Sequence, residues 1–222
     1  MGVAENLQGI KRSLPPSVTL VAVSKTKPDS MVMEAYEAGQ RDFGENKVQD
    51  LRDRAERLPG DIRWHMIGHL QTNKAKYLAP FVHLIHGVDS LKLLKSVNKE
   101  AFKNQRVIDC LLQVRIAEEE TKFGLTRDDI VSLLGSPEYG ELENVRIRGL
   151  MGMATYTENW EQIRQEFRHL NAIFEALKTS FFKGQEHFDQ RSFGMSGDYR
   201  LALEEGTTMV RIGSLIFGPR NY

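Results

Sequence analysis

The sequence predicts an α/β protein in which eight parallel strands, with a helix after each of the first seven, close into a single barrel. Short β-rich runs alternate with helical segments along the whole chain, and no Pro-, Gly- or Ser-rich linker separates them. This alternation favours a parallel sheet with right-handed crossovers, and eight such units favour closure over an open sheet. We expect residues 1–222 to form one domain, with an extra N-terminal helix that ends at about Arg12.

Each predicted element has its own local pattern. Most strands are dense in Val, Ile and aromatic residues, and they are expected near 18–24, 41–43, 63–67, 81–86, 107–114, 145–150, 187–191 and 208–212. The helices after them are expected near 29–39, 46–57, 72–78, 90–103, 127–134, 160–177 and 198–205. The first begins at Asp29, an acidic N-cap candidate. The longest carries an apolar stripe that predicts packing: Trp160, Ile163, Phe167, Leu170, Phe174 and Leu177.

The composition excludes several classes of protein. Thirty basic residues balance thirty acidic ones, so we expect no general nucleic-acid binding. Cys110 is the only cysteine, which excludes intrachain disulfides, and its apolar surroundings favour a small buried hydrophobe over a reactive thiol. No run approaches the roughly 18 apolar residues of a membrane-spanning helix, and the N-terminus lacks the apolar core of a secretory signal. We therefore expect a cytoplasmic protein that does not associate with membranes.

Lys25 follows the first predicted strand, at the end of the barrel where active sites of this architecture lie. Strand alternation puts Val21, Val23 and Lys25 on one face, so Lys25 continues a buried row to the barrel mouth. A partly desolvated amine ionises less readily, which suits imine chemistry because only the neutral amine attacks a carbonyl. The alternative is a lysine that extends into solvent, and Lys27, beside Pro28, fits that alternative better.

The loops after the last two strands indicate a phosphate site. The stretch "SFGMSGDYRLALEEG" predicts a loop that opens a short helix, and "VRIGSLIFG" predicts strand eight and a glycine turn. Backbone N–H groups and a helix N-terminus at this place in a barrel attract anions. Ser196, Gly197, Gly213 and Ser214 suit the role, because small residues let the backbone approach and hydroxyls add donors. The alternative is that these pairs form ordinary turns.

Arg211 lies within the β-branched run of the eighth strand and shares a face with Met209 and Gly213. An inward guanidinium would need an acceptor to offset its desolvation, and an aromatic ring nitrogen would serve. The alternative is an arginine on the outer face that pairs with Asp or Glu from a helix.

Five ordered motifs carry a resemblance to a known family: "AVSKTKP", "FGENKVQD", "WHMIGHLQTNK", "GMSGD" and "VRIGSLIFG". They resemble the motifs of the pyridoxal phosphate homeostasis protein family, also called the YggS or PROSC family, from about residue 5 to the C-terminus. The resemblance implies a single (β/α)₈ TIM barrel similar to the N-terminal domain of alanine racemase. This is the fold type III barrel that binds pyridoxal 5′-phosphate (PLP).

The resemblance also implies roles for individual residues. Lys25 matches the lysine that holds PLP as a Schiff base, and Asn46 matches a residue near the cofactor ring. Arg211 matches the arginine that faces the pyridine nitrogen. The residues that match phosphate contacts, or are further candidates for them, are Ser196, Gly213 and Ser214.

The family implies a PLP-binding protein of intracellular vitamin B6 and amino-acid homeostasis without an established turnover reaction, so we expect no enzyme. An arginine can only donate, so the ring nitrogen stays unprotonated and the ring is a poor electron sink. The chain stops at Tyr222, just after strand eight, so we expect a monomer without the second domain of alanine racemases. PLP-dependent apoenzymes are candidate recipients of the cofactor.

Two alternatives belong to other classes of protein. A PLP-dependent amino-acid racemase or decarboxylase would need a second acid/base group opposite Lys25, from a dimer contact or a tyrosine such as Tyr156. A regulatory binding protein would instead use PLP as a structural or sensing element and dock a partner on one face of the barrel.

The histidines indicate no metal site. His65 and His69 are spaced as i and i+4, but they lie in a strand and the turn after it, so we expect structural roles. The remaining histidines are expected to be packing or surface residues: His83, His86, His169 and His187.

The sequence departs from the family pattern in two places. In the stretch before and including "EEETKFG" (118–124), Arg115 and Ala117 replace the more usual Asn or Ser, and near strand seven Arg191 and Phe193 replace Leu and Met. We expect these departures to alter only the rim of the pocket.

Overall fold

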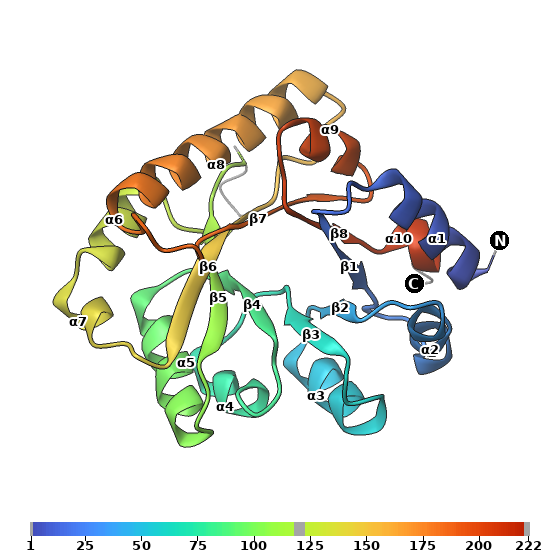
Figure 1. The fold of residues 1–222 in the computed structure, drawn as a ribbon, viewed down its shortest axis with the longest axis horizontal. Coiled ribbons are helices and arrows are strands. Elements are labelled where there is room, and N and C mark those ends of the chain that lie inside the picture. Colours follow the sequence, from blue (N-terminus) through green and yellow to red (C-terminus); the bar gives the residue numbers. More distant parts are fainter. Residues whose placement is uncertain (1, 118–122, 220–222) are drawn as a thin grey trace.

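Eight parallel strands form a closed barrel with helices around it, which confirms the predicted architecture (Figure 1). The computed structural model describes residues 2–117 and 123–219. Within these ranges each strand pairs with the next along the chain, and β8 pairs with β1 to close the sheet. The strands are β1 (Thr19–Val23), β2 (Asp42–Glu45), β3 (Arg63–Met66), β4 (Leu84–Val88), β5 (Ile108–Val114), β6 (Val145–Gly152), β7 (Gln190–Met195) and β8 (Met209–Ile212).

Helices follow the strands on the outside of the barrel. The α-helices are α1 (Val3–Ser13), α2 (Asp29–Glu37), α3 (Val48–Arg57), α4 (Ala75–Leu78), α5 (Leu91–Lys103), α6 (Arg127–Leu134), α7 (Pro137–Gly140), α8 (Trp160–Ser180), α9 (Tyr199–Glu204) and α10 (Ser214–Phe217). A 3₁₀ turn, η1 (Thr72–Lys74), precedes α4. Helix α1 is the extra N-terminal helix, and it lies beside α10 (Figure 1), where Asn6 Nδ2 donates to the carbonyl of Ile216 at 3.1 Å.

The apolar core has two parts, because each strand buries both of its faces. The inner cluster fills the barrel and consists of Val21, Leu84, Leu111, Met151 and Met209, with Met153 packed against it. The outer cluster lies between the sheet and the helices and includes the stripe of α8, except that Trp160 at the start of this helix is 57% exposed. Leu20 and Ala22 belong to the outer cluster, so the alternation predicted for strand one is confirmed.

Two predicted strands are displaced, and glycines explain both errors. The prediction for strand four, 81–86, is too early, because β4 continues through Gly87 to Val88. A Cβ on Gly87 would lie 2.8 Å from the carbonyl oxygen of Gly68, so the strand needs a glycine there. The prediction for strand seven, 187–191, also ends too soon, because β7 runs to Met195 through a bulge at Gly194, whose φ is 95°.

Four further features of the helices differ from the predictions. The residues after β8 form the short helix α10 rather than a simple glycine turn, and α7 was not predicted. Helix α3 begins at Val48, so Asn46 lies in the loop before it rather than in a helix from 46. Asp29 is the first residue of α2 rather than its N-cap, which is Pro28.

Two expectations from composition concern burial and helix length. Cys110 on β5 is fully buried, and this burial raises the pKa of its thiol well above the ordinary value, as expected for a small core residue. Across residues 2–117 and 123–219, no helix has the length and apolarity needed to cross a bilayer.

Candidate functional site

Lys25 lies in the middle of a tight turn that leaves the C-terminal end of β1. The backbone N–H of Lys27 donates to the carbonyl of Ser24 at 3.1 Å, which closes the turn over Lys25 and Thr26. Thr26 has a φ of 64°, the left-handed value that the third residue of a type II turn requires. Lys25 is half-buried, whereas Lys27 donates through its Nζ to the carbonyl of Pro219 at 2.6 Å.

Arg54 on α3 donates hydrogen bonds to the backbone of this turn. Its guanidinium donates to the carbonyl of Ser24 at 3.1 Å, to the carbonyl of Lys27, and to Asp29 Oδ1 at 3.2 Å. It also donates to Glu45, which accepts a hydrogen bond of 2.6 Å from Ser24 Oγ. Burial raises the pKa of Glu45, and the nearby Arg54 opposes this shift. A buried ion pair therefore fixes the backbone on both sides of Lys25.

Asn46 follows β2 directly and is exposed at the same end of the barrel. A Cβ on Gly68 would lie 2.4 Å from the carbonyl oxygen of Asn46, so the loops after β2 and β3 are in close contact. Asn46 lines a cavity of about 290 Å³ together with His69, Gln71 and Tyr77. Asn46 therefore lies at a hollow that it shares with residues following β3.

Ser196 and Gly213 meet between the loops after β7 and β8. The backbone N–H of Gly213 donates to Ser196 Oγ at 3.2 Å. A Cβ on Gly213 would lie 3.0 Å from the carbonyl oxygen of Val23, so this glycine packs against the end of β1 that leads to Lys25. Ser214 is exposed and begins α10, and Ser196 lines a cavity of about 500 Å³ with Gly197. The sequence-predicted phosphate residues are therefore neighbours.

Arg211 is buried inside the barrel, so the alternative of an outward arginine paired with a helix carboxylate is wrong. Its side chain donates to Ser192 Oγ at 2.7 Å, to the carbonyl of Ser192 at 2.8 Å, and to the carbonyl of Gly152 at 3.0 Å. It pairs in register with Val21 on β1. Burial lowers the pKa of Arg211 to about 10, which still leaves the guanidinium charged at neutral pH.

The structure thus gathers the predicted residues at one end of the barrel. Lys25, Asn46 and Gly213 follow β1, β2 and β8, and Ser196 follows β7. The strands connect them, because Val23 pairs with Gly44 and the N–H of Ser24 donates to the carbonyl of Gly44 at 3.1 Å. This arrangement places an amine, small residues with hydroxyls, and a buried guanidinium around the same strand ends.

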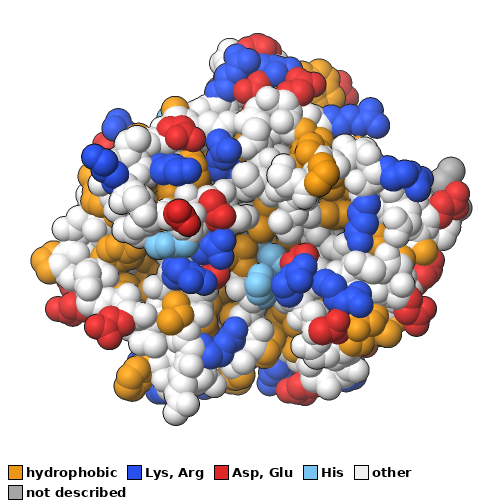
Figure 2. All heavy atoms as spheres, viewed as in Figure 1, with side chains coloured by type: hydrophobic (Ala, Val, Ile, Leu, Met, Phe, Trp, Pro, Cys, Tyr) orange, Lys and Arg blue, Asp and Glu red, His pale blue; other side chains and the backbone are white. Residues whose placement is uncertain are grey.

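His65 and His69 lie in different surroundings. His65 is 1% exposed within the barrel, whereas His69 Nδ1 lies 3.2 Å from Asp89 Oδ2 and its ring stacks on Phe123 with ring centroids 4.5 Å apart. The prediction of structural roles for these two residues agrees with these contacts. Figure 2 shows histidine side chains beside basic and acidic ones near the centre of one face of the molecule.

A chain of buried polar residues crosses the barrel interior, and sequence reasoning missed it. Ser192 Oγ lies 3.2 Å from His86 Nδ1, His86 Nε2 lies 3.0 Å from His65 Nδ1, and His65 Nε2 lies 3.1 Å from Asp42 Oδ1. Since Arg211 contacts Ser192, the chain connects Arg211 to Asp42. The only sequence signal was the presence of polar residues within buried strands, which strand alternation alone could not assign to one another.

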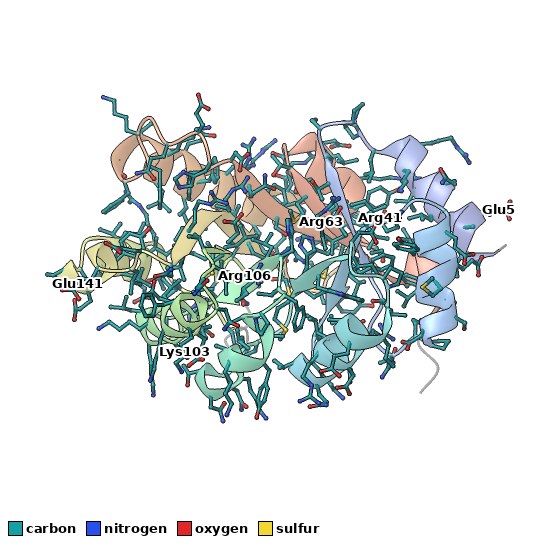
Figure 3. All side chains as sticks on the ribbon, turned by 60° about the horizontal axis from the view of Figure 1, so that its bottom comes forward. Glu5, Arg41, Arg63, Lys103, Arg106 and Glu141 are labelled. Carbon is teal, nitrogen blue, oxygen red and sulfur yellow. The ribbon has the colours of Figure 1, made fainter. Side chains whose placement is uncertain are left out.

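Charged residues surround the other end of this chain. Arg63 donates to Asp42 Oδ1 and Oδ2 at 2.7 and 2.5 Å, and Figure 3 labels Arg63 near Arg41. Asp42 and Asp109 line one cavity of about 310 Å³. Asp109 pairs with Arg148 at 2.9 Å. Two carboxylates with arginine partners therefore lie at this end, and only Asp42 belongs to the chain.

The expectation that the departures from the family pattern alter only the rim of the pocket is wrong for Phe193, which lies in the core between the sheet and the helices. Arg115 is exposed, Ala117 is 8% exposed, and Phe193 is buried against Phe167 with ring centroids 4.7 Å apart. Arg191 is half-buried and lies 3.6 Å from Glu175, on α8. Residues 118–122 of the "EEETKFG" segment lie outside the described residues.

Comparison with known proteins supports the resemblance given by the motifs. Residues 2–221 match the family described as "Alanine racemase, N-terminal domain". The pyridoxal phosphate homeostasis protein of Aquifex aeolicus (strain VF5) is 42% identical over 205 residues, which cover 91% of this chain and 87% of that protein. The chain belongs to the pyridoxal phosphate homeostasis protein family. The family member from Escherichia coli (strain K12) is 36% identical over 212 residues, with coverage of 94% and 88%.

Solved structures give the same family relationship. PipY of Synechococcus elongatus PCC7942, solved without PLP, is 36% identical, has a TM-score of 0.90, and is matched over 97% of this chain and 100% of that chain. PipY solved with PLP bound is 35% identical, has a TM-score of 0.86, and has the same coverage. This chain and PipY therefore share the fold of the closed barrel.

Proposed function

We propose that this protein binds PLP as a Schiff base on Lys25 and holds it for intracellular vitamin B6 and amino-acid homeostasis. The observation that carries the proposal is Arg211, a buried guanidinium that pairs in register with Val21 on the strand leading to Lys25. The names of the relatives and the PLP bound to PipY support the proposal.

The described residues fit the three parts of this cofactor. Arg211 offers the donor that an unprotonated pyridine nitrogen accepts. Ser196, Gly213 and Ser214 offer hydroxyls and backbone N–H groups to the phosphate, and a Cβ on Gly197 would meet no atom within 4 Å, so this loop is open to a ligand. Lys25 offers the amine that bonds to the aldehyde carbon. When bound, PLP supplies a carbonyl carbon that exchanges one amine for another.

The same residues favour a holder over a catalyst. Arg211 cannot protonate the ring nitrogen, so the ring is poorly suited to stabilising a carbanion. A racemase also needs a second acid/base group, and Tyr156, the tyrosine considered for that role, is 97% exposed in the loop after β6. We propose that the protein is not an enzyme and that it passes PLP to dependent apoenzymes.

We further propose that this transfer takes place in the cytoplasm and that the protein is a monomer and one domain over residues 1–222. A monomer leaves the mouth of the barrel open to an apoenzyme that receives PLP. Size-exclusion chromatography with light scattering tests this directly: a mass near 25.3 kDa is expected, and a stable dimer would contradict the monomer.

Absorbance spectra with added PLP test the assignment of Lys25. The wild-type protein is expected to develop the visible band of an imine, and Lys25→Ala is expected to lose it. Lys27→Ala is the matched control, because Lys27 lies in the same turn but is hydrogen-bonded to Pro219. Equal bands in the two variants would contradict the role of Lys25.

Exchange of the amino-acid α-proton tests the absence of turnover. A panel of amino acids is incubated in D₂O with the PLP-loaded protein, and the α-proton signal is followed by NMR. The expected rate equals that of free PLP at the same concentration. An acceleration of more than about a hundredfold, the lower end of general acid–base catalysis, would indicate an enzyme instead.

A further inference from the structure

The polar chain inside the barrel has one direction of donation, which can be derived from its acidic end. Burial opposes the charge on Asp42, but hydrogen bonds from Arg63 and His65 prevail and hold its pKa well below the ordinary value, so Asp42 can only accept. His65 therefore donates through Nε2, and its Nδ1 accepts when the ring is neutral. His86 must then donate through Nε2 and accept at Nδ1 from the Ser192 hydroxyl.

The basic end of the chain is compatible with the same direction. Arg211 can only donate, so Ser192 Oγ accepts from it and has its own proton free for His86 Nδ1. The two derivations meet at His86 without conflict. Ser192 and His86 are both 0% exposed, and His65 is 1% exposed, so water does not compete for these bonds.

The direction of each bond therefore follows from the Asp42 end of the chain. A neutral serine between Arg211 and His86 donates once and accepts once, and each neutral histidine does the same. Reversing any one of these bonds requires its neighbour to reverse as well, or a proton to enter the barrel. Burial and the nearby Arg211 charge lower the pKa of His86 well below its usual value, which keeps the ring neutral.

A metal ion is the alternative occupant of the Asp42 end. The ligand atoms of Asp42, His65 and His83 lie within 4.8 Å of one another. However, Arg63 already donates to both oxygens of Asp42, and His65 Nε2 donates to Oδ1. A metal would have to displace both partners, whereas the directed chain accounts for all of these contacts.

We propose that Asp42, His65, His86 and Ser192 are positioning residues that fix the Arg211 guanidinium against the cofactor ring through one directed hydrogen-bond chain. The inference rests on the proposed function, because the ring is that of PLP. It adds that PLP binding depends on a residue at the opposite end of the barrel from the proposed site, because Asp42 begins β2 whereas Lys25 follows β1. If these residues only filled the core with hydrogen-bonded polar groups, changing them would not affect PLP binding.

The tautomers of the two histidines give a test that does not depend on PLP. In protein labelled with ¹⁵N-histidine, long-range ¹H–¹⁵N spectra at neutral pH distinguish Nε2–H from Nδ1–H rings. Both His65 and His86 are expected as the neutral Nε2–H tautomer. A proton on Nδ1 of either ring would overturn the directed chain, even if PLP binds as proposed.

Two matched variants test the link to the cofactor. Asp42→Asn removes a charge at the end of the chain, and Asp109→Asn removes one that is also paired with arginines and lines the same cavity. Asp42→Asn is expected to weaken PLP binding, whereas Asp109→Asn keeps the Kd within about twofold of wild type. Equal effects of the two variants on PLP binding would overturn the proposal.

Ser192→Ala provides a conservative second variant in case Asp42→Asn does not fold. It removes the hydroxyl between Arg211 and His86, while the Ser192 carbonyl still accepts from Arg211. The expected loss of PLP affinity is about tenfold, with a shifted absorbance maximum and a native thermal transition. An unchanged Kd and spectrum would overturn the positioning role. If the wild-type protein binds no PLP, the proposed function fails, and the histidine tautomers still decide the chain.

Discussion

At the scale of single residues, Thr26 stands out because a β-branched side chain rarely adopts a positive φ. The strain of such a conformation is about 1–3 kcal/mol, and the turn around Lys25 maintains it. The surrounding contacts must offset this strain, and Arg54 supplies three of them by bonding to Ser24, Lys27 and Asp29.

Thr26→Gly is expected to stabilise the fold by about 1 kcal/mol. Glycine relieves the strain of the positive φ. Its larger conformational entropy in the unfolded chain offsets roughly 0.5–1 kcal/mol of the resulting stabilisation. Urea unfolding measures the difference. Thr26→Val keeps the β-branch and should leave stability nearly unchanged, so a glycine variant less stable than the valine variant would contradict the strain.

His86 should make stability depend on pH between about 5 and 6.5. Its pKa in the folded protein is lowered by burial, so at these pH values the unfolded chain binds a proton that the folded chain does not. Stability therefore falls as the pH drops below the unfolded pKa of about 6.5, by about 2 kcal/mol from this residue over 1.5 pH units.

Urea unfolding at pH 5.0 and 6.5 checks this dependence. His86→Gln removes the titrating ring, so the change in unfolding free energy between the two pH values should be smaller in this variant by about 2 kcal/mol. An equal change in wild type and variant would show that His86 is not the residue responsible.

At the scale of elements, helix α3 positions the turn after β1 through two arginines with different surroundings. Arg54 is 7% exposed and reaches the buried Glu45, whereas Arg57 is exposed and pairs with Asp29 at 2.8 Å. A buried ion pair is costly to break, because the remaining charge stays desolvated, while an exposed pair contributes little. The two arginines thus provide a natural comparison on one helix.

Arg54→Lys is expected to lower the free energy of unfolding by about 3 kcal/mol, because a lysine cannot reproduce the forked set of bonds to Glu45 and the turn. Arg57→Lys should lower it by no more than about 0.5 kcal/mol. Chemical denaturation of both variants measures these values. Similar losses in the two variants would refute the bracing role of Arg54.

The elements also show what sequence patterns can and cannot predict. The existence of all eight strands follows from β-rich runs, because each strand buries both faces. The ends of β4 and β7 could not be predicted from these runs, because Gly87 and Gly194 resemble turn residues in sequence. Their roles come from the close approach of Gly68 in one case and from a bulge in the other, and both depend on neighbouring strands.

The candidate site shows the same limit. The motifs and the rule that sites lie at strand ends found Lys25, Asn46, Ser196 and Gly213, and the structure brings them to one end of the barrel. The chain of Asp42, His65, His86 and Ser192 was not found, because its members come from four strands and only the closure of the barrel brings them together.

At the scale of the whole molecule, the proposed binding residues and the polar chain occupy different parts of the barrel. Its C-terminal end carries the residues proposed to bind PLP, and its interior carries a polar chain from Arg211 to Asp42. Since the residues of the polar chain lie on strands of one closed sheet, their spacing is fixed by the fold rather than by mobile loops. The proposed holder therefore needs no large movement to keep its guanidinium in place.

The most direct test of the central claim is to locate the covalent bond to PLP. The protein is loaded with PLP, reduced with borohydride, digested and analysed by mass spectrometry. The added mass of the reduced cofactor is expected on Lys25, with Lys27 unmodified. A modification spread over several lysines, or found on Lys27 instead, would contradict the central claim.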